Sequence, residues 1–79
     1  MPTLLTVNGI RFFFFSNEND EPTHVHFVKG EAIGKSWLDP VKIAYWKGFK
    51  AVEKRVILQT IEDNKILFNK KWNAYFTKK

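Results

Sequence analysis

The last third of the chain carries one continuous apolar stripe with the period of an α-helix. At about 100° per residue, one narrow arc of such a helix contains Ile57, Ile61, Phe68, Trp72 and Tyr75. Asp63 and Asn64 do not interrupt the phase, which favours one long helix over residues 51–76, although these two residues are the natural place for a kink or turn. A helix of about 26 residues spans about 39 Å. Part of it must therefore overhang a small sheet, bend back or meet another chain.

The sequence before the stripe consists of short β-type runs separated by turn residues. Asn8-Gly9 lies between the runs 3–7 and 10–15, and it predicts a hairpin because both central positions of a type I′ turn need positive φ. Two further strands are expected over residues 23–28 and 32–38. Gly34 is expected to mark a weak point or a bulge in the second of them.

Residues 41–46 can form a short fifth strand or a helical turn, and their alternation favours the strand. Two sets of side chains are then expected on opposite faces, Val41, Ile43 and Tyr45 against Lys42, Ala44 and Trp46. The whole pattern predicts an α+β fold. An antiparallel sheet of four to five strands is followed by one long C-terminal amphipathic helix, straight or kinked, that packs on the sheet.

Seventy-nine residues are expected to form a single domain, with a sheet region over 1–46 and a helical region over 49–77. The chain contains no cysteine, which excludes disulfides and thiolate metal sites as sources of stability. Eight Phe, three Trp and two Tyr supply large rings from which a short chain can build a core.

The net charge of +5 is unevenly distributed, because residues 1–41 carry −2 and residues 42–79 carry +7. This asymmetry suits an acidic partner, either nucleic acid or an acidic protein surface, and a solvated lysine-rich helix is the alternative. The first five residues lack the features of a secretory signal, and no window reaches 18 apolar residues. We therefore expect a cytoplasmic protein that makes no contact with membranes.

The pair His24-Val25-His26 is the most specific chemical feature. On a strand, residues i and i+2 point to the same face, so the two imidazoles are expected roughly 7 Å apart. Such a pair can act as general acid and base across a phosphodiester, or can provide two metal ligands. Only the loop carboxylates of Glu18, Asp20 and Glu21 are available to complete a metal site, so no metal or cofactor is predicted. A purely structural role on a half-exposed sheet face is the other interpretation.

Two cations are expected to share the sheet with the histidines. A guanidinium from Arg11 can hold a phosphate, so the predicted catalytic set is His24, His26 and Arg11, although the face of Arg11 stays open. The predicted nucleic-acid-binding set is Lys35, Lys65, Lys70 and Lys71. Aromatic residues interleaved with Lys42, Lys47 and Lys50 can stack single-stranded bases, but they are interpreted first as core.

The run of four phenylalanines at 12–15 is apolar on both faces of its strand. Because one helix can cover only one face of the sheet, the second face is expected to meet another protein, either a second copy or a dedicated partner. The predicted interface residues are Phe13, Phe15 and Trp46. A strongly twisted sheet that buries both sides of a central strand is the alternative.

Several segments together resemble the small bacterial domain-of-unknown-function family numbered 4160. They are Ile10 to Glu18, Pro22 to His26, Trp37 to Val41, Gly48-Phe49 and Trp72 to Phe76. The likeness covers nearly the whole chain, and its most specific part joins the Arg-Phe-Phe and Ser-Asn-Glu segments to His-Val-His. The chain departs from the usual pattern at Thr23, where a second proline is common, and at Lys50, where a helix-capping Ser is common.

The resemblance implies a small stand-alone protein, encoded beside a second small domain in modules of which some are described as toxin–antitoxin pairs. We therefore expect a toxin–antitoxin-like component that binds a small cognate protein encoded nearby, or itself, with RNA as a further candidate partner. Ribonuclease-type chemistry at the histidines is one form of this hypothesis. The alternative is a non-catalytic module that binds nucleic acid or protein through the basic helix and the aromatic sheet face.

Overall fold

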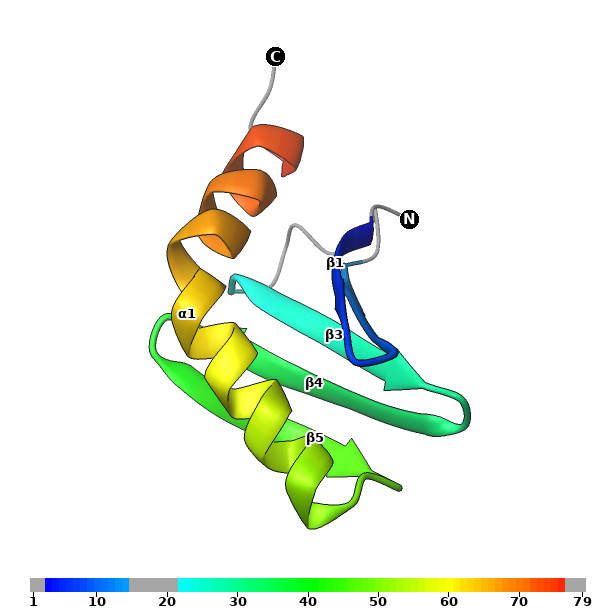
Figure 1. Ribbon diagram of the computed structural model, residues 1–79. Coiled ribbons are helices and arrows are strands. Elements are labelled where there is room, and N and C mark those ends of the chain that lie inside the picture. The colour runs from blue at the N-terminus through cyan, green and yellow to red at the C-terminus, as the bar shows by residue number, and fades with distance from the viewer. Residues whose placement is uncertain (1–2, 15–21, 77–79) are drawn as a thin grey trace.

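The computed structural model describes residues 3–14 and 22–76. Figure 1 shows an antiparallel sheet with a single helix lying across one of its faces. The elements in chain order are β1 (Thr3–Val7), β2 (Ile10–Phe13), β3 (His24–Lys29), β4 (Ala32–Leu38), β5 (Val41–Lys47) and α1 (Ala51–Phe76). Strands adjacent in sequence are adjacent in the sheet, so β3 is its central strand. The predicted α+β fold is confirmed, with a fifth strand and one helix that continues through Asp63.

The turn between β1 and β2 has the geometry that its two residues predict. Asn8 has a φ of 51° and Gly9 a φ of 80°, so both central positions are in the left-handed region that a type I′ turn requires. Val7 pairs with Ile10 across this turn. The dipeptide therefore sets the register that brings Phe12 and Phe13 into the sheet.

The apolar stripe of α1 forms the helical half of the core. Ile57, Ile61 and Phe68 are fully buried. The Phe68 ring stacks on Phe12 with a centroid distance of 6.0 Å, and Trp72 meets Phe14 edge-on at 5.2 Å. The face of the sheet that carries Phe12 is therefore the face covered by α1.

Gly34 provides space for a neighbouring ring and does not form a bulge. It pairs in register with Phe27 on β3 and with Trp46 on β5. A Cβ atom at this position would lie 2.1 Å from Cε2 of Phe27, whose ring is fully buried. The irregularity of β4 against β5 occurs one residue later, between Lys35 and Ser36.

The first turn of α1 is stabilised without a serine cap. The Lys50 amide donates to Oε1 of Glu53 at 2.8 Å, which is one half of a capping box, and Lys29 Nζ donates to Oε2 at 2.8 Å. At its other end, α1 projects beyond the strands, as expected from its length (Figure 1). Nowhere in residues 3–14 and 22–76 is a helix both long and apolar enough to cross a membrane.

Candidate functional site

The sheet face opposite α1 is defined by the strand registers, because directly paired residues point to the same side. One row across the sheet runs from Phe13 through His26 and Lys35 to Tyr45. A second row pairs Arg11, Val28, Ile33 and Lys47, and a third pairs His24, Trp37 and Lys42. We call this surface the open face.

The two histidines project from β3 on this face and touch each other. Their ring centroids are 5.1 Å apart, closer than the roughly 7 Å expected from strand geometry, and the rings are nearly perpendicular. His26 also stacks on Phe13 at 5.6 Å. His24 meets Trp37 edge-on at 5.6 Å, and Trp72 reaches it from α1 at 4.8 Å.

Both imidazoles are buried in the single chain, with His24 0% and His26 8% exposed. Nδ1 of His24 lies 2.9 Å from the carbonyl oxygen of Pro22, an acceptor, so the ring donates from Nδ1. In the neutral ring this tautomer leaves the lone pair on Nε2, which is itself buried. A general acid or base must come within hydrogen-bond reach of its substrate, so a substrate could reach these two rings only after a local rearrangement.

The cations predicted to accompany the histidines lie on the open face. The Arg11 guanidinium carbon is 4.8 Å from the centroid of Phe13, which places Arg11 on the side of Phe13 and His26. Lys35 pairs with His26, and its Nζ lies 4.4 Å from the centroid of the Trp37 ring. The structure therefore brings His24, His26, Arg11 and Lys35 to the same face.

A bulge changes which side chains of β5 reach this face. Lys35 pairs with Tyr45 and Ser36 with Ile43, so Ala44 is the extra residue. The expected alternation of side chains between the two faces of β5 is therefore wrong after Ile43. Tyr45 joins the open face, whereas Trp46 pairs with Gly34 on the side of α1.

One exposed part of the open face lies on β4 and β5. We call it the β4–β5 patch and define it as Ile33, Lys35, Trp37, Lys42, Tyr45 and Lys47. Ile33 is 44% and Tyr45 47% exposed, and the lysines of β5 are exposed as well. Within the described ranges every Asp and Glu lies in a turn or in α1 and none in a strand. The patch thus combines aromatic rings with positive charge.

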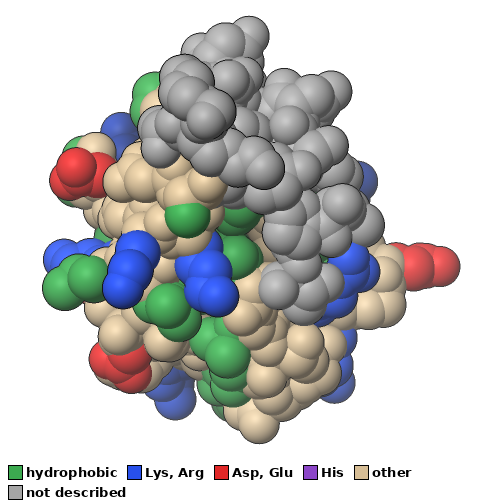
Figure 2. All heavy atoms as spheres, turned by 90° about the horizontal axis from the view of Figure 1, so that it is seen from above, with side chains coloured by type: hydrophobic (Ala, Val, Ile, Leu, Met, Phe, Trp, Pro, Cys, Tyr) green, Lys and Arg blue, Asp and Glu red, His purple; other side chains and the backbone are tan. Residues whose placement is uncertain are grey.

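The predicted nucleic-acid-binding lysines do not form one surface. Lys35 belongs to the β4–β5 patch, whereas Lys65, Lys70 and Lys71 are exposed on α1, which covers the opposite face of the sheet. Lys65 lies 3.7 Å from Glu62 in a weak surface ion pair. Viewed from above, Lys and Arg side chains lie among hydrophobic side chains on the visible face (Figure 2).

The predicted partner residues are distributed over different environments. Phe13 is 5% exposed within the single chain, so it needs no second protein to cover it. Trp46 is half-buried against the core on the side of α1, and Lys54 Nζ lies 5.2 Å from its ring centroid. Phe15 lies outside the described residues.

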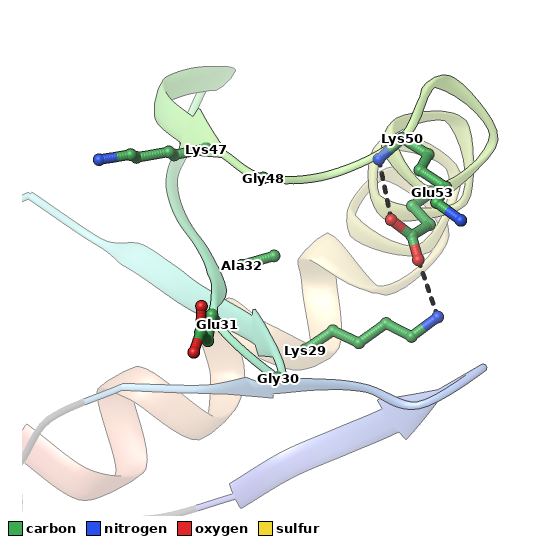
Figure 3. Close-up of a pocket in the computed structure, with 8 residues that line it drawn as sticks. All are labelled: Lys29, Gly30, Glu31, Ala32, Lys47, Gly48, Lys50 and Glu53. Atoms are coloured by element: carbon green, nitrogen blue, oxygen red, sulfur yellow. Dashed lines mark hydrogen bonds and ion pairs between the residues drawn. The ribbon is translucent and has the colours of Figure 1, made fainter.

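A separate pocket of about 670 Å³ lies beside the first turn of α1 (Figure 3). Lys29 and Lys50 converge there on Glu53, and their hydrogen bonds hold the pKa of its carboxyl below the ordinary value. Lys47 also lines the pocket but extends away from Glu53. Because the Glu53 carboxylate already takes the hydrogen bonds of this helix end, we assign no ligand to the pocket.

Among residues 3–14 and 22–76, no three His, Asp or Glu side chains lie close enough together to hold a metal ion. The carboxylates considered for such a site, Glu18, Asp20 and Glu21, lie outside those ranges. Sequence reasoning missed Tyr45 as a site residue. The position of Tyr45 between Lys42 and Lys47 was the sequence signal that could have identified it. The expected alternation, however, placed the Tyr45 side chain on the wrong face of the strand.

Comparison with known proteins identifies the family but adds no activity. No curated protein and no solved structure matches the chain. A model of the domain of unknown function DUF4160 matches residues 9–73, which include the whole of β2, β3, β4 and β5 and most of α1. Because this match covers well over half of the 79 residues, the protein belongs to the DUF4160 family.

Proposed function

We propose that the protein is a non-catalytic binding module that takes nucleic acid on the β4–β5 patch. The supporting observation is the composition of this exposed surface. Lys35, Lys42 and Lys47 surround Trp37 and Tyr45 on a sheet face that carries no carboxylate from any described strand. Phosphates provide the complementary charge, and bases provide flat apolar surfaces for the rings.

The ribonuclease hypothesis at His24, His26 and Arg11 is less well supported. Both imidazoles are buried among aromatic rings, and a phosphodiester cannot reach them without a rearrangement. Their contacts suit a structural role in holding β3 against its neighbours. Incubation of labelled RNA with the wild type and with His24→Ala decides this point. Cleavage by the wild type that the variant loses, with an unchanged melting temperature, would restore the catalytic hypothesis.

A toxin–antitoxin-like role with a small cognate partner is a second proposal, and it is supported by the outer surface of α1. Ile66 is 79% and Leu67 38% exposed, and Lys70 and Lys71 follow them on the helix. This surface combines apolar and positive groups and suits an acidic protein. Expression in a bacterial host with and without the neighbouring gene, scored for growth and for co-purification, tests the role. Unchanged growth and no co-purification would exclude it.

The nucleic-acid proposal is tested by comparing two variants that lose the same charge, one from the β4–β5 patch and one from α1. The Lys42→Gln, Lys47→Gln double variant removes two cations from the patch, and Lys70→Gln, Lys71→Gln removes two from α1. Each phosphate contact contributes about 0.7 to the slope of log affinity against log salt for single strands. The patch variant should therefore lower the slope by about 1.4, and it should weaken binding roughly 60-fold at about 50 mM salt if affinities are equal at 1 M.

The helix variant is the matched control, because it has the same net charge as the patch variant. It should bind with nearly the slope of the wild type. If the helix variant loses affinity and the patch variant does not, the binding surface lies on α1 and the proposal is wrong.

A further inference from the structure

Tyr45 is the most exposed ring of the β4–β5 patch. It is 47% exposed and stands directly opposite Lys35 in the ladder between β4 and β5. The bulge at Ala44 turns it onto the open face, which leaves its ring available as a flat apolar surface beside a cation. A lone exposed tyrosine carries no information about a ligand. Because Tyr45 lies among the lysines of the β4–β5 patch, its exposed ring indicates a ligand that carries both negative charge and flat apolar surfaces.

Trp37 lies diagonally from Tyr45 across the two strands, because Trp37 pairs with Lys42 and Lys35 with Tyr45. Diagonal neighbours in an antiparallel ladder are about 7–8 Å apart. His24 meets the indole at a centroid distance of 5.6 Å with the two ring planes nearly perpendicular, and the Lys35 ammonium lies 4.4 Å from the centroid of the indole ring. Lysine side chains are flexible, so an arriving phosphate can draw this ammonium away and uncover the ring.

The combination distinguishes between forms of nucleic acid. In a duplex the base faces are stacked on each other, so a protein meets phosphates and groove edges. In a single strand the base faces are free to stack on aromatic side chains. Lysines alone would accept either form, whereas Tyr45 and Trp37 add a contact that only a single strand can use.

We propose that the β4–β5 patch binds single-stranded nucleic acid, with one base stacked on Tyr45, the next on Trp37, and Lys35 transferred from the indole to the phosphate between them. This inference rests on the proposed nucleic-acid function and specifies its ligand. RNA and single-stranded DNA share the recognised chemistry, and the test separates them. An acidic protein shares only the charge, and a polyglutamate peptide represents it.

The test measures the affinities of fluorescently labelled ten-nucleotide oligouridylate, oligothymidylate, a duplex of the same length and polyglutamate. One stacked base contributes about 5- to 150-fold to affinity. Tyr45→Ala should weaken binding of the single strands within that range and leave duplex and polyglutamate binding unchanged. Tyr45→Phe should bind as the wild type does, because it keeps the ring. Melting temperatures of the variants control for folding.

Tryptophan fluorescence provides a second readout. Oligouridylate should quench the wild type through Trp37, and Trp37→Phe should lose most of this quench although Trp46 and Trp72 remain. The inference is overturned if Tyr45→Ala keeps full affinity for single strands, if it weakens all ligands equally, or if the quench persists in Trp37→Phe. If the Lys42→Gln, Lys47→Gln variant loses nucleic-acid binding while Tyr45→Ala binds as the wild type does, the proposed stacking is refuted but the proposed nucleic-acid function is not. Absence of any nucleic-acid binding would overturn the proposed function as well.

Discussion

Replacement of Gly34 by alanine tests the packing that joins the sheet to α1. A Cβ at this position would lie 2.1, 2.5 and 2.9 Å from three atoms of the Phe27 ring. That ring cannot easily move, because it is fully buried and contacts Phe12 at 5.9 Å and Phe49 at 5.6 Å between ring centroids. We expect the overpacking to destabilise the protein by about 1–3 kcal/mol.

For a domain of this size, 1 kcal/mol corresponds to about 4–8 °C in melting temperature. Gly34→Ala should therefore lower the melting temperature by roughly 4–24 °C in a circular dichroism melt. Gly30→Ala shows a different kind of cost, because a Cβ at Gly30 meets nothing within 4 Å and only its positive φ of 60° is unfavourable, by about 1–2 kcal/mol.

A double-mutant cycle separates overpacking from a general effect of alanine in a strand. Phe27→Leu leaves a smaller side chain opposite position 34, so Gly34→Ala should cost less in that background than in the wild type. Additive effects of the two substitutions would refute this packing explanation. So would a Gly34→Ala protein as stable as the wild type.

Two further predictions concern α1. Phe68→Ala should destabilise the protein by about 3–5 kcal/mol because the ring is fully buried, whereas Ile66→Ala, at a 79% exposed position, should change stability by about 0.5 kcal/mol or less in urea melts. Comparable losses would contradict the assigned helix face. Glu53 has a lowered pKa in the folded protein, chiefly because of the hydrogen bond from the Lys29 side chain and then the hydrogen bond from the Lys50 amide. The contribution of the ionised carboxylate to the stability of the protein is therefore present above pH 4.5 and is lost as the pH falls below that value. Glu53→Gln should accordingly lower the melting temperature at pH 7 and have less effect at pH 3, and an equal effect at both pH values would be evidence against the ionised capping contact.

The strands and the helix could be predicted from the sequence because their signals are local. Asn8-Gly9 determines its own turn, and the apolar stripe of α1 keeps its helical phase from Ile57 to Trp72. These patterns need no knowledge of neighbouring elements. The predicted limits of β4 and α1 coincide with those of the structure for this reason.

The features that the sequence could not supply depend on pairing between strands. The bulge at Ala44 exchanges the faces of Tyr45 and Trp46, and only the register against β4 determines its place. The burial of the histidines likewise depends on rings brought by three other elements, including Trp72 from α1. Spacing could therefore predict that His24 and His26 share a face, but not that this part of the face is closed.

The most direct test of the open face as the binding surface is an NMR titration of the ¹⁵N-labelled protein with oligouridylate. The amide signals of β4 and β5 should shift, with the largest changes around Lys35, Trp37 and Tyr45, while those near Lys70 in α1 stay unchanged. Shifts confined to α1, or no shifts at low salt, would contradict the account.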